Sequence, residues 1–98
     1  MLNNCVIVGK IKEVKQKEGF TLLLVDVKRP YKNVNGEYES DLIPVRVFGD
    51  NNYGHLLERL TGIKGRIQVI DNGDVVIQSD RITFLGNYEE EYNNEINI

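Results

Sequence analysis

Residues 31–49 read YKNVNGEYESDLIPVRVFG, and this stretch decides the fold because it holds a chain reversal and the strand that follows. Asn35-Gly36 strongly favours a tight turn, so residues 29–37 are predicted as a loop or hairpin end with that pair at its tip. Residues 39–48 are predicted as a strand. Pro44 lies inside it and has no N–H to donate, so we expect an edge position or a bulge there.

Four more strands are predicted outward from this stretch, at residues 5–11, 20–28, 63–70 and 75–85. They are runs rich in β-branched and aliphatic residues, too short to favour a helix. A basic turn at residues 15–19 separates the first two strands, and residues 71–74, Asp-Asn-Gly-Asp, supply a second hairpin signal between the last two.

One short helix is predicted between the third and fourth strands, where Asn51 or Asn52 could cap a segment that runs through Leu60 and ends at Gly62. The chain therefore has three strands, one helix and two strands, in that order. This all-β order is typical of an OB-fold, a five-stranded Greek-key barrel with one short helix between strands 3 and 4. A small barrel or sandwich of another kind is the alternative that the pattern leaves open.

Composition limits what the chain can do. With 98 residues it has room for one small domain, and 41% hydrophobic and 28% charged residues fit a soluble globular module. Cys5 is the single cysteine and His55 the single histidine, which excludes an internal disulfide and a Cys/His zinc site. With no phosphate-binding loop or dinucleotide fingerprint, we expect no enzyme, no cofactor and no metal.

The sequence also has no apolar run near the roughly 20 residues of a membrane helix, and no signal peptide opens it. We therefore expect a cytoplasmic protein with no membrane partner.

The charge is distributed unevenly. The chain carries 12 Lys and Arg against 15 Asp and Glu, for a net charge of −3, and four of the acids (Glu89, Glu90, Glu91 and Glu95) lie in the last ten residues. Without those four, 12 basic residues face 11 acidic ones. We predict a domain over residues 1–86 with an anionic partner, and an acidic, flexible tail over residues 87–98 with a separate role.

Aromatic and basic residues interleave around the quoted stretch, a pattern that suits single-stranded nucleic acid, because bases stack on rings while cations meet phosphates. The interleaved residues are Arg29, Tyr31, Lys32, Tyr38, Arg46 and Phe48. Arg46 and Phe48 are two apart and so share one face of their strand. Lys10 and Lys12 also share a face and, with Lys28 and Lys32, could line one groove, although solvated lysines are the plainer reading.

Other aromatic residues are assigned to packing. Phe20 and Tyr38 are more typical of packing or hairpin positions, and Phe84, among aliphatic neighbours, is predicted to belong to the core. Tyr38 stays among the candidate nucleic-acid contacts.

Three stretches resemble the single-stranded DNA-binding proteins of bacteria and phages, as a short variant of that family. They are residues 1–11, residues 31–49, and residues 65–68 with 82–86. The resemblance implies an OB-fold that binds single-stranded DNA without base chemistry, as a homo-oligomer (dimer or tetramer) assembled through its first strand. It also implies base stacking on Tyr31 and Phe48, and phosphate contacts at Lys10, Lys32 and Arg66.

The sequence departs from the family at several points. It has no tryptophan, Leu42 stands where an aromatic is often found, and residues 70–75 form a tight turn in place of a long hairpin. Residues 94–98 are loosely similar to the family's acidic-hydrophobic tip, which recruits replication and repair proteins. The implied partner-binding residues are Glu89, Glu90, Glu91, Glu95, Ile96 and Ile98.

Two functions follow as hypotheses. The first is sequence-independent binding and protection of single-stranded DNA in DNA replication, recombination or repair. The second is an OB-fold adaptor of a primosome or repair complex that acts mainly through protein contacts and binds DNA or RNA weakly. Within the first hypothesis RNA stays open, because stacking and phosphate contacts do not distinguish the sugar.

Overall fold

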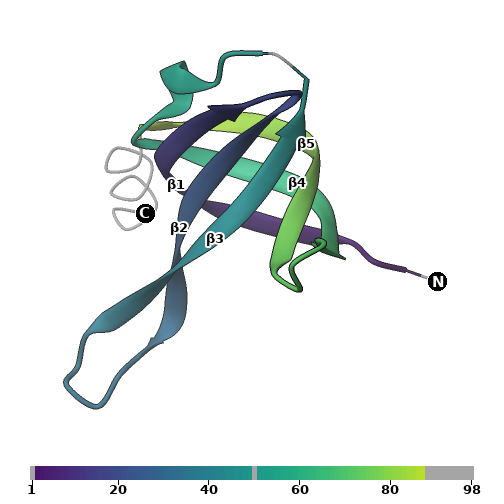
Figure 1. Cartoon of the computed structure of the whole chain (residues 1–98). Helices are drawn as coiled ribbons and strands as arrows, with labels where there is room; N and C mark the ends of the chain where they lie inside the picture. Colours follow the sequence, from purple (N-terminus) through teal and green to yellow (C-terminus); the bar gives the residue numbers. More distant parts are fainter. Residues whose placement is uncertain (1, 50, 88–98) are drawn as a thin grey trace.

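The computed structural model describes residues 2–49 and 51–87, and its architecture is an all-β barrel (Figure 1). The elements are β1 (Cys5–Lys17), β2 (Phe20–Lys32), β3 (Tyr38–Phe48), η1 (Gly54–Leu56), β4 (Arg59–Val69) and β5 (Val75–Asn87). The five predicted strands and their order are confirmed. The longest helix in the described ranges is the single 3-10 turn η1, so no helix there could cross a membrane.

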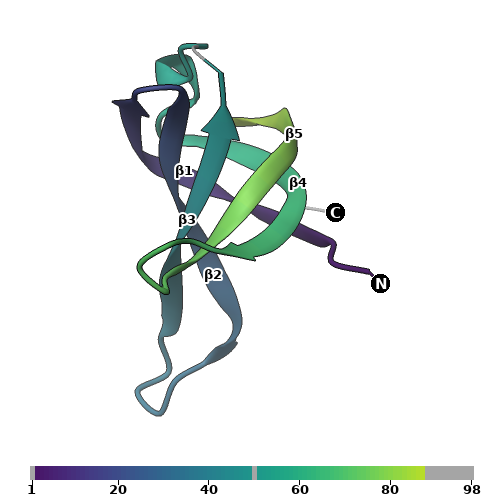
Figure 2. The same ribbon diagram turned by 45° about the vertical axis from the view of Figure 1, so that its right-hand side comes forward.

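The strands close into a barrel in the order β1-β2-β3-β5-β4, so that β1 lies between β2 and β4 (Figure 1, Figure 2). Neighbouring strands are antiparallel except β3 and β5, which run parallel. That parallel contact is a seam of two residue pairs, Val45 with Ile77 and Arg46 with Gln78. Such a barrel, with a helical turn between the third and fourth strands, is the OB-fold, and the predicted fold class is confirmed.

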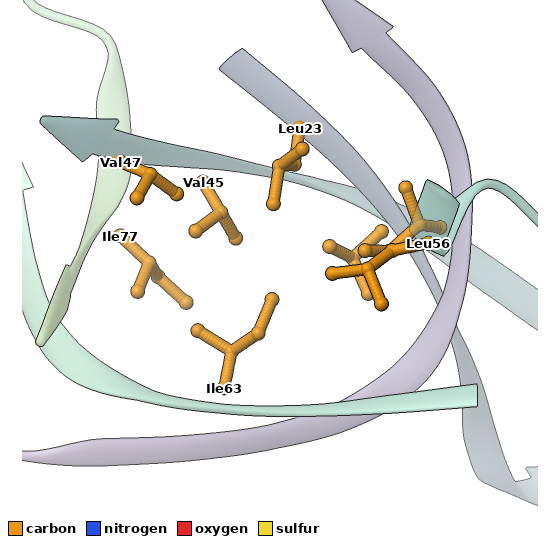
Figure 3. Close-up of a cluster of buried hydrophobic side chains, with 8 residues drawn as sticks. Leu23, Val45, Val47, Leu56, Ile63 and Ile77 are labelled. Atoms are coloured by element: carbon orange, nitrogen blue, oxygen red, sulfur yellow. The ribbon is translucent and has the colours of Figure 1, made fainter. Parts of the chain in front are cut away.

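Aliphatic side chains from all five strands fill the barrel. The buried cluster consists of Ile11, Leu23, Val25, Val45, Val47, Leu56, Ile63 and Ile77. Along β2, Thr21, Leu23 and Val25 are fully buried and the residues between them are half-buried, the alternation of a strand with one face on the core. Leu56, from η1, lies at one end of the cluster (Figure 3).

Two glycines allow backbones to cross closely as the barrel closes. Gly9 lies where β1 leaves β4 and joins β2, since the next residue, Lys10, pairs with both strands. A Cβ on Gly9 would overlap the carbonyl oxygen of Asp26, and one on Gly65 would overlap that of Gln78. Both obstacles are backbone atoms, so a side-chain movement cannot relieve them.

The helix predicted to run through Leu60 is wrong in length, because η1 is one turn and β4 has begun before that residue. The side-chain Oδ1 of Asn52 accepts a hydrogen bond from the N–H of Gly54 at 2.8 Å, which makes a tight turn in place of a longer helix. Glu58 then has a φ of 64°, a left-handed backbone that cannot continue a right-handed helix. Gly62, predicted to end the helix, lies inside β4.

Strands β2 and β3 run on past the barrel as a two-stranded projection, which we call the hairpin arm (residues 28–42; Figure 1). The loop predicted over residues 29–37 is therefore shorter than expected, because β2 continues to Lys32 and β3 begins at Tyr38. The register shifts between Lys28 and Lys32, where β2 carries extra residues.

The turns at both predicted hairpin tips are confirmed. In the arm, the side-chain Oδ1 of Asn33 accepts two backbone N–H hydrogen bonds, at 2.9 and 3.0 Å, and Gly36 has a φ of 78°. At residues 71–74, a backbone hydrogen bond of 2.9 Å closes the β4–β5 turn and Gly73 has a φ of 92°. Both glycines take a conformation that other residues rarely adopt.

Two further local predictions have separate outcomes. The basic turn predicted at residues 15–19 is shorter, because β1 extends to Lys17 and the chain reverses over two residues that end at Gly19. Pro44 lies just before the segment of β3 that pairs with β5, and the β2–β3 register passes it without a shift. The predicted edge position is therefore confirmed, and the alternative, a bulge at Pro44, is not.

We expect Gly65→Ala to lower the free energy of unfolding by roughly 1–3 kcal/mol, as overpacking in a tight site does. Gly62→Ala is the matched control in the same strand, because its Cβ would make an ordinary contact with Leu85 Cδ1 at 3.5 Å. Urea denaturation measures both variants. Equal unfolding midpoints would contradict the close backbone crossing at Gly65.

Candidate nucleic-acid interface

The outer face of β2 and β3 carries two phenylalanines at the end where these strands meet the β1–β2 turn. Phe20 lies directly opposite Phe48. Two residues further along β2, on the same face, Leu22 lies opposite Arg46. Phe48, the last residue of β3, is 61% exposed, and Phe20 is half-buried. The register thus brings two rings and a cation together at the end of this sheet.

Arg46 lies between the two rings. Its guanidinium carbon is 5.3 Å from the ring centre of Phe48 and 5.8 Å from that of Phe20, both within cation–π distance. Its Nε donates to Oε1 of the buried Gln78 at 3.2 Å, and Nε2 of Gln78 donates to the carbonyl oxygen of Arg46 at 3.3 Å. The shared face predicted for Arg46 and Phe48 is confirmed, and Gln78 holds the guanidinium over it.

Phe20 and Arg46 line an open hollow of about 370 Å³, which we call the aromatic groove, and Phe48 lies next to it beside Arg46. Its lining residues are Lys17, Phe20, Leu22, Pro44, Arg46, Ile70, Asp74, Val75 and Val76. The groove therefore lies on the β2–β3 face, between the β1–β2 turn and the β4–β5 turn. OB-folds bind oligonucleotides at this place.

The hairpin arm adds a second cation–aromatic pair. Lys32 lies opposite Tyr38, with its Nζ 5.7 Å from the ring centre. Tyr38 and Leu42 are separated by even numbers from Arg46 along β3, so they follow the face that carries the groove. Tyr31 is 62% exposed on the same arm. The arm thus continues the groove with exposed aromatic, apolar and basic side chains.

Arg29 differs from the other candidate contacts in the arm, because it is held by carboxylates. Its Nε and Nη2 donate to Asp41 at 3.0 and 2.8 Å, and its Nη1 donates to Glu39 at 2.9 Å. Glu39 and Asp41 alternate along β3 with Tyr38 and Leu42, so the two acids belong to the opposite face of the strand. The hydrogen bond from Arg29 lowers the pKa of Asp41, and the same bond raises the pKa of Arg29.

The two candidate lysines of β1 surround one carboxylate. The Nζ of Lys10 is 3.0 Å and that of Lys12 3.7 Å from Glu58, and the hydrogen bond from Lys10 lowers the pKa of Glu58. Neither lysine lines the aromatic groove, and neither does Lys28, which lies at the base of the arm. The aromatic groove is therefore not the common groove that was predicted for Lys10, Lys12, Lys28 and Lys32.

Arg66 lies on the outer face of β4, and its Nη1 is 3.3 Å from Asp80 Oδ1. Both side chains are half exposed, so this ion pair is a surface pair.

Sequence reasoning missed several residues of this region. Gln78 was not considered, Lys17 was interpreted as part of a solvated basic turn, and Phe20 was assigned to packing. The pairing of Phe20 with Phe48 depends on the β2–β3 register, which shifts between Lys28 and Lys32, so no signal in the sequence revealed it. Phe84, predicted to be in the core, is 49% exposed with the guanidinium carbon of Arg59 5.4 Å from its ring centre, so that prediction is wrong.

A separate apolar surface lies across β1, β4 and β5. We call it the valine face; its lining residues are Val6, Val8, Gly62, Ile63, Lys64, Arg81, Thr83 and Leu85. Val6 and Val8 are 69% and 47% exposed. In residues 2–49 and 51–87, no three His, Cys, Asp or Glu side chains gather as a metal site requires. The tail candidates from Glu89 to Ile98 lie outside the described residues.

No protein-family model and no curated protein sequence matches this chain. Solved structures do match it, and among them are single-stranded DNA-binding proteins and a PriB domain with this barrel. The chain thus has the OB-fold of that class of protein, as the resemblance implied.

Three of these structures define the likeness. A small single-stranded DNA binding protein from Mycoplasma pneumoniae has a TM-score of 0.66 and 15% identity, over 85% of this chain and 93% of that one. The dimeric N-terminal domain of PriB from Thermoanaerobacter tencongensis has a TM-score of 0.60 and 17% identity, over 87% and 98%. A deletion mutant of the Thermus aquaticus single-stranded DNA binding protein has a TM-score of 0.55 and 19% identity, over 89% and 52%.

The ion pair of the arm makes a testable prediction. Because the pKa of Asp41 is lowered, its contribution to stability is present above the unfolded-state pKa and is lost as the pH falls through the lowered value. In Arg29→Met we expect the pKa of Asp41 to rise toward the ordinary range of an aspartate, because the hydrogen bond that lowers it is lost. NMR titration of the carboxyl carbons measures it. Glu58 serves as the internal control, and an unmoved Asp41 would contradict the assignment.

Proposed function

We propose that this protein binds single-stranded DNA without regard to sequence and protects it during DNA replication, recombination or repair. The observation that carries the proposal is the placement of Arg46 between Phe20 and Phe48 on the β2–β3 face. A ring offers stacking to any base, and a cation beside it meets the phosphate that follows. The fold shared with single-stranded DNA-binding proteins supports the same reading.

The mechanism follows from the order of side chains along the surface. Bases stack on Phe20 in the aromatic groove, on Phe48 next to it, and on Tyr38 and Tyr31 along the hairpin arm. Phosphates are met by the cations set beside these rings, which are Lys17, Lys32 and Arg46. Four stacked bases contribute roughly 4–12 kcal/mol before the cost of ordering the strand. A duplex hides its base faces, so it gains no stacking from this surface.

The partially paired cations have a smaller part in this proposal. Arg29, Lys10, Lys12 and Arg66 each have a carboxylate within 4 Å, so a phosphate must compete with that carboxylate. Lys28, at the base of the arm, stays a candidate phosphate contact.

We propose further that the protein assembles as a homodimer through the valine face. Singly exposed valines are common, but Val6 and Val8 adjoin Leu85 and Thr83 in one apolar hollow. The dimeric PriB domain, which shares the fold, supports an assembly of this kind.

A second candidate function is an adaptor of a primosome or repair complex, with weak binding of DNA or RNA. The likeness to the PriB domain favours it. In this case the tail residues from Glu89 to Ile98 bind a replication or repair protein, and the cytoplasmic barrel carries that tail.

Fluorescence anisotropy with labelled poly-dT and a matched duplex, at several salt concentrations, tests the proposal. We expect tight binding of the single strand, little binding of the duplex, and a log–log salt slope of about −0.7 for each phosphate contact. Phe48→Ala should weaken binding about 5- to 150-fold, the equivalent of one lost stacked base at about 1–3 kcal/mol. Arg46→Gln should reduce the salt slope by about 0.7.

Ile67→Ala is the control for these variants, because Ile67 is half exposed on β4 and does not line the groove. If the wild-type protein fails to bind poly-dT at low salt, the adaptor function replaces this proposal. If it binds and Phe48→Ala binds equally well, the groove is not the binding surface.

The assembly is tested by sedimentation. Val8→Glu places a carboxylate in the valine face, so we expect the sedimenting species to fall from dimer to monomer with the fold intact. Val34→Glu is the matched control, because Val34 is fully exposed at the far end of the arm. An unchanged mass for Val8→Glu would exclude this face as the dimer contact.

A further inference from the structure

A second cation–aromatic site lies at the η1 end of the barrel. Arg59, the first residue of β4, holds its guanidinium carbon 5.4 Å from the ring centre of Phe84 in β5. His55 and Leu56 of η1 complete an open hollow of about 400 Å³ around this pair. None of these residues lines the aromatic groove. The hollow is therefore a separate site.

The chemistry of this pair repeats that of the groove. The guanidinium–ring distance is 5.3 Å for Arg46 and Phe48 and 5.4 Å for Arg59 and Phe84. Both phenylalanines are about half exposed or more, whereas a phenylalanine that served only the core would be buried. Each ring thus presents an apolar surface to solvent beside a fixed positive charge.

Charge pairing sets these two arginines apart from others. Arg29 and Arg66 are ion-paired to carboxylates. Within the described residues, no carboxylate lies within 4 Å of the guanidinium of Arg46 or of Arg59. The acid next to Arg59 in sequence, Glu58, is bound by two lysines of β1. Among these residues, no ion pair neutralises the charge of Arg59, which suits a phosphate contact.

We propose that Arg59 and Phe84 form a second stacking site for the single strand, an inference that rests on the function proposed above. A base stacks against the exposed surface of Phe84, and the adjoining phosphate meets Arg59. His55 adds a ring nitrogen to the same hollow as a further polar group for the backbone of the strand.

The path between the two sites crosses one end of the barrel. The end of β3, where Phe48 lies, and the turn η1 are both at the top of the view in Figure 1. A strand that leaves the aromatic groove beyond Phe48 can therefore continue over this end to Phe84. Because the groove must be filled first, the second site requires a longer oligonucleotide.

The chain has no tryptophan, so a single introduced tryptophan reports on one site alone. Phe48→Trp and Phe84→Trp are titrated with dT oligonucleotides of about 6 to about 35 nucleotides, which run from the lower part of the roughly 4–16 nucleotides that one OB-fold covers to well beyond its upper limit. We expect every oligonucleotide that binds to quench the tryptophan at 48, and only the longer ones to quench that at 84. Ile67→Trp, half exposed on β4 and outside both the groove and the hollow, is the matched control and should stay unquenched.

Affinity gives an independent readout. Phe84→Ala should bind the longer oligonucleotides at least about fivefold more weakly and the shortest ones unchanged, since one stacked base is lost. Circular dichroism verifies the fold of each variant.

The outcomes separate this inference from the proposed function. Quenching at position 48 without quenching at position 84 at any length overturns the second site and leaves the groove in place. Absence of binding by the wild-type protein overturns both. A loss of affinity in Phe84→Ala that is equal at all lengths and comes with a smaller sedimenting species identifies the hollow as a protein interface, which also overturns the second site.

Discussion

The whole architecture depends on β1 forming hydrogen bonds with two strands at once. Its first half pairs with β4, its second half pairs with β2, and Lys10 belongs to both ladders. The exchange of partners requires the backbone of β2 to approach β1 at Gly9, where a side chain would strike a carbonyl oxygen. Only after this closure do β2 and β3 present one face to the core and the other to solvent. The aromatic groove is the solvent side of that arrangement.

Intramolecular ion pairs then decide which cations remain for a ligand. Arg29 is bound by two acids across the arm, and Glu58 gathers two lysines near the start of β4. Such exposed pairs stabilise a protein little. Their larger effect here is to fix side chains and neutralise charge away from the rings. Arg46 is fixed differently, by the neutral amide of Gln78, which orients the guanidinium and does not neutralise its charge.

The sequence predicted those features that depend on neighbours along the chain. Hairpin residues such as Asn35-Gly36 and β-branched runs are local signals, and they placed all five strands. The predicted helix is too long because the side chain of Asn52 accepts a hydrogen bond from the N–H of Gly54 and closes a tight turn there. Helix propensities of single residues do not describe this competition between a side chain and the backbone. Phe84 was assigned to the core because its neighbours in sequence are aliphatic. In the structure it lies near the end of β5, beyond the core, and is half exposed. Gln78 offers no signal, since its role arises only when β5 meets β3.

The two-pair seam between β3 and β5 is the shortest hydrogen-bonded contact in the barrel, and the side chain of Gln78 bridges it. Segments with few ladder hydrogen bonds open at the lowest free energy, so we expect local opening of the barrel along the β3–β5 seam. The aromatic groove lies across the same seam, with Pro44 and Arg46 of β3 on one side and Val75 and Val76 of β5 on the other. A ligand bound across the seam contacts β3 and β5 and so holds the two strands together. The melting temperature of the barrel thereby becomes a reporter of occupancy, because binding to the closed form alone raises its stability.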